Sequence, residues 1–185
     1  MNRPSAPVAI AIALPLLLAL VVAGIAITVR VRGLDGSAPP PPETTALAVA
    51  PVDAPQAAGP QCSALLANLN GDLPADGGTL PQRALADPVQ PGVRAWAAAP
   101  RPVVLRCGLP RPEELVPTSA LLVINGVSWL KLDDGVPDPV VVSYVAVDRP
   151  VYVVLTTPTA AGSGPLQQVS DVLRTTQPAT PVAVR

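Results

Sequence analysis

The sequence predicts an α+β fold, in which an antiparallel sheet of about four to six strands packs with two short helices in one small domain. Short runs rich in Val, Leu and Ile alternate with turn residues, as in the strands of an antiparallel sheet. Two further segments show the spacing of apolar residues that is typical of helices. An N-terminal transmembrane helix and a Pro-rich linker are predicted ahead of this domain.

The strands are predicted from apolar runs bounded by Gly, Pro, Asn or Asp. The predicted strands are residues 93–97, 103–107, 121–124, 127–132, 140–147 and 151–157. Asn125-Gly126 separates two of these runs, and this dipeptide is typical of a two-residue hairpin turn because both positions require a positive φ. Residues 71–92 are rich in Pro, Gly and Asp and are predicted to form a loop.

The two helices are predicted from one-sided apolar spacing. Residues 63–70 place three leucines on one face. Residues 163–175 begin with Ser163 as the N-cap and carry Pro165 in the first turn, which favours a helix start. Their apolar stripe consists of Leu166, Val169, Val172 and Leu173.

Composition divides the chain of 185 residues into five parts. They are a short cytoplasmic tail (1–5), a transmembrane helix (6–29), a Pro/Ala-rich disordered linker (30–60), an extracytoplasmic α+β domain (61–177) and a frayed tail (178–185). The second part carries no charge, and a helix of its length spans roughly 36 Å against a hydrocarbon core of roughly 30 Å. A cleaved signal peptide is the alternative, although its apolar region normally has about 7–15 residues.

The location of the domain is predicted from its cysteines and its linker. Arg residues flank the apolar run on both sides, so the positive-inside rule does not decide the orientation. A Pro-rich linker acts as a semi-rigid spacer, which has little purpose for a cytosolic domain. We therefore expect a single-pass protein of the cell membrane with its domain on the extracytoplasmic side.

Cys62 and Cys107 are the only cysteines of the chain. Two cysteines with none left over, in a chain that is expected to be exported, predict one disulfide bond. Two buried free thiols in a cytosolic domain are the alternative. The bond would close a loop of about 46 residues and so restrict the unfolded chain.

The residue types present exclude several classes of function. The chain has no His, which removes the usual zinc ligand sets and the Ser-His-Asp triad. Its net charge is −1, so it lacks the electrostatic footprint of a nucleic-acid-binding protein. No phosphate-binding loop or dinucleotide fingerprint is present. We therefore predict no metal site, no cofactor, no nucleic-acid partner and no small-molecule ligand.

One motif and two acidic pairs are the candidates for catalysis. Ser128 and Lys131 match the Ser-x-x-Lys pattern of penicillin-binding proteins and β-lactamases. That chemistry requires both residues on a helix, whereas the predicted strand directs their side chains to opposite faces. The acidic pairs, Glu113-Glu114 and Asp133-Asp134, lie in predicted loops and are more typical of solvated surface. We assign no catalytic residue from the sequence.

The predicted strand 140–147 is apolar on both faces. A sheet of this kind needs a cover on both sides. In one interpretation the helices cover one face and loops cover the other. In the second interpretation one face binds a partner.

Three short stretches carry a family resemblance. They are Val104-Leu105-Arg106-Cys107-Gly108, the stretch 123–129 (VINGVSW) and the stretch 146–152 (AVDRPVY). With them the chain resembles an uncharacterised family of actinobacterial membrane-anchored envelope proteins over residues 61–173. That resemblance implies a cell membrane location and an extracytoplasmic domain, and it implies no functional residues.

These observations favour a non-catalytic binding or scaffolding module of the cell envelope. Its expected partners are the membrane, through the single span, and an envelope protein. The alternative is a hydrolase or transferase that acts on envelope material and uses carboxylates, or Ser128 with Lys131. That alternative lacks a base whose ordinary pKa lies near 7, so we do not expect an enzyme.

Overall fold

The computed structural model describes residues 18–24, 43–132 and 135–184. The chain divides into two compact units, Met1–Pro40 and Pro41–Arg185. In the first unit the described residues, 18–24, are helical. The second unit holds the α+β domain.

The predicted transmembrane helix over residues 6–29 is contradicted. Of that range, residues 6–17 and 25–29 lie outside the described part of the chain. The described helical stretch, 18–24, extends by roughly 10 Å, about a third of the hydrocarbon core. No helix within the described residues is long and apolar enough to cross a membrane.

Seven strands form one antiparallel sheet in the order β3-β4-β5-β9-β8-β7-β6. The strands are β3 (Gln82–Arg83), β4 (Val93–Trp96), β5 (Val103–Leu109), β6 (Leu121–Ile124), β7 (Val127–Leu132), β8 (Val141–Ala146) and β9 (Tyr152–Pro158). A separate two-stranded sheet pairs β1 (Leu73–Ala75) with β2 (Gly78–Leu80). The α+β class is confirmed, whereas the prediction of about four to six strands is wrong.

The additional strands come from residues 71–92, which the composition predicts to form a loop. β1 and β2 are joined by Asp76-Gly77, a dipeptide typical of hairpin turns, but each strand has only 3 residues. β3 has 2 residues, and its Arg83 is buried. Arg83 Nε donates to the carbonyl oxygen of Thr45 at 2.6 Å. A tertiary contact therefore holds β3 in place, although its sequence has no apolar pattern that predicts a strand.

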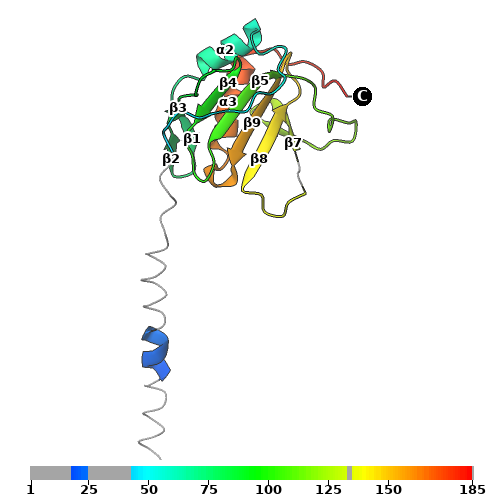
Figure 1. The fold of residues 1–185 in the computed structure, drawn as a ribbon. Helices are drawn as coiled ribbons and strands as arrows, with labels where there is room; N and C mark the ends of the chain where they lie inside the picture. Colours follow the sequence, from blue (N-terminus) through cyan, green and yellow to red (C-terminus); the bar gives the residue numbers. More distant parts are fainter. Residues whose placement is uncertain (1–17, 25–42, 133–134, 185) are drawn as a thin grey trace, which may run out of the picture. The chain divides into compact units, whose positions relative to one another are not determined.

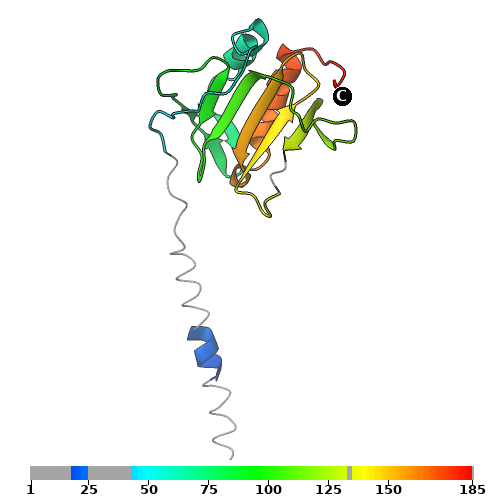
Figure 2. The ribbon, with the colours of Figure 1, turned by 45° about the vertical axis from the view of Figure 1, so that its right-hand side comes forward.

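Helices α2 (Pro60–Asn68) and α3 (Gly164–Thr176) pack against one face of the sheet, which we call the inner face. Figures 1 and 2 show α3 lying along this face. A 3-10 helix, η1 (Thr159–Ala161), precedes α3. The described part of the domain thus holds the two α-helices that were predicted for it, and residues 18–24 form a separate helical stretch.

Two tryptophans occupy the core between the helices and the sheet. The chain has no Phe to fill this core. Trp96 and Trp129 are both fully buried. Trp129 Nε1 donates to Ser170 Oγ of α3 at 2.9 Å, and Trp96 Nε1 donates to the carbonyl oxygen of Gly71 at 2.9 Å. Each ring therefore buries its apolar surface without leaving its N–H group unpaired.

The hairpin of β6 and β7 turns at Asn125-Gly126, as predicted. Both residues have positive φ angles, 49° and 78°, as a two-residue hairpin turn with this dipeptide requires. The turn also contacts α3, because Asn125 Nδ2 donates to the carbonyl oxygen of Gln167 at 3.4 Å.

Residues 43–57, which we call the N-terminal segment, pair with the domain although the composition predicts a disordered linker up to residue 60. Leu47 donates to Ala84 O at 2.8 Å and accepts from the N–H of Ala86 at 2.9 Å. Gly108 permits a second close contact, because a Cβ atom there would lie 2.3 Å from the amide nitrogen of Ala57. Main-chain hydrogen bonds, which composition does not reveal, thus order this half of the predicted linker. The other half, 30–42, lies outside the described residues.

The C-terminal tail also contacts the domain where fraying was predicted. The N–H of Thr180 donates to Asp148 O at 2.9 Å, and Arg111 Nε donates to Ala183 O at 2.8 Å. These contacts place the tail beside the turn between β8 and β9 and beside the loop that leads from β5 to β6.

Candidate functional site

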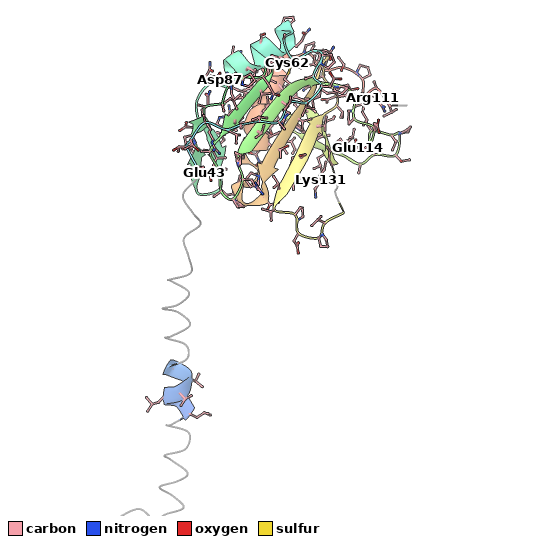
Figure 3. All side chains as sticks on the ribbon, viewed as in Figure 1. Glu43, Cys62, Asp87, Arg111, Glu114 and Lys131 are labelled. Carbon is pink, nitrogen blue, oxygen red and sulfur yellow. A yellow bond between two sulfur atoms is a disulfide. The ribbon has the colours of Figure 1, made fainter. Side chains whose placement is uncertain are left out.

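The predicted disulfide bond is confirmed. Cys62 of α2 and Cys107 of β5 are joined with a Cα–Cα distance of 5.6 Å, across 45 residues of sequence. Both cysteines are buried in the core. The bond ties the first helix of the domain to the centre of the sheet, and it lies at the end of the domain where Figure 3 labels Cys62.

The face of the sheet that points away from α3, the outer face, is covered from two sides by chain segments. The N-terminal segment lies over β4 and β5, where it lines a hollow with Val93 and Arg106 (Figure 1). On the other side Leu115 packs on Leu130 of β7 and Val145 of β8. These two covers agree with the interpretation in which helices protect one face and loops protect the other.

Between the two covers, within the described part of the chain, a row of four residues stays partly exposed. The register places them side by side across four strands, from β5 through β9 and β8 to β7. We call this row the open strip; it consists of Val104, Thr156, Ser143 and Leu132. All four side chains are half-buried. Ser143 Oγ and Thr156 Oγ1 lie 2.8 Å apart and form a hydrogen bond, so two hydroxyl groups sit between two aliphatic ones.

Arg106 borders the open strip on the side of the N-terminal segment. Its register partners are Val93 and Val154, and its Nη2 donates weakly to the carbonyl oxygen of Ala50 at 3.4 Å. Its buried Nε has no hydrogen-bond partner among the described residues. Burial lowers the pKa of the Arg106 guanidinium, because desolvation disfavours its charged form. Arg106 therefore places a guanidinium beside the strip, with only a weak hydrogen bond from its Nη2.

At its other end the open strip leads into a polar hollow of about 660 Å³. The strip contributes Leu132 and Ser143, and charged side chains come from Glu114, Lys131 and Asp138. Figure 3 shows Glu114 and Lys131 on the same side of the domain. The structure thus places Glu114 and Lys131 in one hollow. In the sequence they belong to different candidate groups, Glu114 to an acidic pair and Lys131 to the Ser-x-x-Lys motif.

Of the remaining catalytic candidates, the described ones, Ser128 and Glu113, do not line this hollow. Ser128 lies three positions before Lys131 in β7, so the two side chains leave the strand on opposite faces. The backbone N–H of Ser128 donates to Asp148 Oδ2 at 2.9 Å. Glu113 is exposed beside Glu114 and does not line the hollow. Asp133 and Asp134 lie outside the described residues.

A buried ion pair, Asp148 with Arg149, was not anticipated from the sequence, which predicts a turn there. Arg149 Nη1 lies 3.0 Å from Asp148 Oδ1, and the two side chains are 2% and 13% exposed. Arg149 Nη2 also donates to the carbonyl oxygen of Gly126 at 2.8 Å, while Asp148 accepts from Ser128. The pair therefore locks the β6–β7 hairpin to the β8–β9 turn, and it joins two of the three stretches that carry the family resemblance.

The geometry offers contact surface and hydrogen-bonding groups more than reactive chemistry. In the part of the chain that the structure describes, no three His, Cys, Asp or Glu side chains are grouped so as to hold a metal ion. The open strip combines aliphatic contact, two hydroxyl groups and a flanking guanidinium. Such a surface suits the binding of an extended molecule by van der Waals contact and hydrogen bonds.

Comparison with known proteins agrees with the resemblance to an uncharacterised family. A family model described as a protein of unknown function (DUF3515) matches residues 12–182. No curated protein and no solved structure matches the chain. The family match covers the disulfide, the open strip and the buried ion pair alike. The chain therefore belongs to the DUF3515 family of proteins of unknown function.

Proposed function

We propose that this domain is a non-catalytic binding module of the cell envelope that holds a protein partner on its open strip. The observation that carries the proposal is the half-buried row across β5, β9, β8 and β7, which stays partly exposed between two described segments of the chain itself. Sheet residues of this type gain free energy from burial, roughly 25 cal/mol for each Å² of apolar surface. A partner laid along the strip would supply that burial.

The polar groups around the strip give the partner an orientation. Arg106 stands at one end, and Lys131, Glu114 and Asp138 stand at the other. Charges at the rim of an interface contribute to specificity and to the rate of association more than to affinity. A protein segment with an acceptor near Arg106 and groups of mixed charge near Lys131 fits this arrangement.

The alternative is an enzyme that acts on envelope material. It would have to work without the Ser128–Lys131 pair as a unit, because the two side chains leave β7 on opposite faces. Glu114, Lys131 and Ser143 share the polar hollow, so they are the residues that such an enzyme would use.

Substitutions on the open strip and in the polar hollow distinguish a binding module from an enzyme. In a strain that depends on the protein, Thr156→Arg is expected to abolish growth, because it places a long charged side chain on the surface that a partner must cover. Lys131→Ala, Glu114→Ala and Ser128→Ala are expected to support growth like the parent. Thr175→Arg, at an exposed position of α3, is the matched control for the added charge and is expected to grow normally.

The reverse pattern of growth would contradict the binding function and favour the enzyme. That pattern is normal growth with Thr156→Arg and no growth with a Lys131→Ala or Glu114→Ala variant that melts like the parent. Thermal melting of each purified variant shows whether a growth defect reflects loss of the fold.

We propose further that the domain works outside the cytoplasm. Disulfide bonds persist in oxidising compartments and are rare in the cytosol, and the chain pairs its only two cysteines in one such bond. The resemblance to envelope proteins of actinobacteria agrees with this location.

A reporter fusion tests the location. Alkaline phosphatase joined after Arg185 is expected to be active, because that enzyme needs disulfide bonds of its own, while a fluorescent protein that folds only in the cytosol is expected to stay dark. A bright cytosolic reporter together with an inactive phosphatase would overturn the proposed location.

A further inference from the structure

The sheet ends in an open edge at β6. Among the strands that the structure describes, β6 pairs only with β7. The two-residue turn makes Ile124 and Val127 a hydrogen-bonded pair, so hydrogen bonding to β7 alternates along β6. The N–H and C=O groups of Leu121 and Val123 therefore point away from the sheet. In agreement, Ser128, the partner of Val123, directs its carbonyl toward β8, where it accepts from Val147 N at 3.0 Å.

This edge lacks the devices that usually prevent pairing with another strand, such as charged side chains or a Pro within the strand. Residues 115–130 contain no Asp, Glu, Lys or Arg. The two central side chains of β6 are exposed, Leu122 to 45% and Val123 to 72%. The opposite edge differs, because Leu47 of the N-terminal segment pairs beside β3. One edge is thus closed by the chain itself and the other is left open.

We propose that β6 is the interface for a second copy of this chain, which pairs with it antiparallel about a twofold axis and extends the sheet from one subunit into the next. The outward backbone groups fix the register. Leu121 and Val123 of one subunit form hydrogen-bonded pairs with Val123 and Leu121 of the partner subunit, and this places Leu122 on the axis, opposite Leu122 of the partner subunit. Only this register uses the strand residues without drawing in the turn.

Charge and shape favour a second copy as the occupant. In this register the residues that flank β6 meet those that flank it in the other copy, and all of them are uncharged, so no like charges face each other. On the inner face a hollow of about 240 Å³ lies beside Leu122 and is lined by Ile124, Tyr144 and Leu166. The leucine from the second subunit enters at the rim of this hollow and buries the exposed surface of Leu122.

The contact is small, and this determines how it should behave. Stable interfaces bury about 1,200–2,000 Å² in total, more than one short strand pair provides. The dimer is therefore expected to form at high protein concentration and to dissociate on dilution. This inference does not depend on the open strip, which ends at Leu132 of β7 and includes no residue of β6.

Engineered cysteines in the full chain test the register. Leu122→Cys places two thiols opposite each other in a non-hydrogen-bonded pair, where Cα atoms are about 4.5 Å apart, within the range of a disulfide bond. Val123→Cys is the matched control, because its two copies would lie roughly 8 to 9 Å apart, beyond that range. After mild oxidation, a non-reducing gel is expected to show a covalent dimer as the main product of Leu122→Cys and little of it for Val123→Cys, although position 123 is the more exposed.

A second variant tests the pairing without a new thiol. Val123→Pro removes an N–H group that points out of the sheet, so the fold is expected to persist while the dimer is lost. Sedimentation should show concentration-dependent dimers for the parent and monomers for Val123→Pro. A parent that stays monomeric at every concentration, or equal crosslinking at positions 122 and 123, would overturn the proposal.

Discussion

Arg149→Met is expected to lower the free energy of unfolding by about 3–5 kcal/mol, the usual cost of removing one member of a buried ion pair. The Arg149 side chain is 2% exposed, and Asp148 is left without its counter-charge when the guanidinium is removed. The carbonyl oxygen of Gly126 also loses its donor. Met keeps much of the aliphatic volume, so the loss reports the charge and its hydrogen bonds. Urea unfolding followed by the fluorescence of Trp96 and Trp129 measures it.

An exposed ion pair on the same domain provides the control. Arg174 and Asp171 lie 3.8 Å apart on α3, with side chains 59% and 48% exposed, and exposed pairs of this kind contribute about 0–1 kcal/mol. Arg174→Met should therefore leave the urea midpoint almost unchanged. The double variant Asp148→Asn with Arg149→Met should cost less than the sum of the single changes, because neither buried charge remains unpaired. If Arg149→Met costs no more than Arg174→Met, the buried pair does not lock the hairpin as described.

Removing the disulfide bond by the double substitution Cys62→Ala and Cys107→Ala is expected to cost about 4 kcal/mol in the chain-entropy model. The bond spans 45 residues, and its loss frees that part of the unfolded chain. A small domain without Phe in its core has little stability to spare. The two alanines avoid unpaired thiols, and urea unfolding of the oxidised parent gives the reference.

Reduction of the parent protein is the control for this substitution. The reduced parent should unfold at a similar urea concentration to the double alanine variant, since both lack the crosslink. If the variant unfolds together with the oxidised parent, then the crosslink does not stabilise the domain, and packing around α2 and β5 alone holds them together.

Local sequence patterns predicted much of the sheet. Six strands lie where runs rich in Val, Leu and Ile are bounded by turn residues, and the positive φ angles of Asn125 and Gly126 match the turn expected from that dipeptide. The pairing of Cys62 with Cys107 followed from counting alone. These features depend on residues that are close in sequence, or on a choice with one possible partner.

Features set by distant contacts were missed. The two-residue strand β3 depends on Arg83, whose partner Thr45 lies 38 positions away. The pairing of Leu47 beside Leu85 is invisible in the Pro- and Ala-rich composition of the N-terminal segment. The predicted transmembrane helix is contradicted as well, because no helix within the described residues is long and apolar enough to cross a membrane.

The candidate site was also predicted in part from the sequence and in part missed. That the sheet would be apolar on both faces could be predicted from strand 140–147, because side chains alternate along a strand whatever surrounds it. The sequence could not predict which outer-face residues remain partly exposed, because their exposure depends on where the N-terminal segment and Leu115 lie. The open strip exists because two covering segments, far apart in sequence, stop short of each other, and only the packed tertiary structure decides that distance.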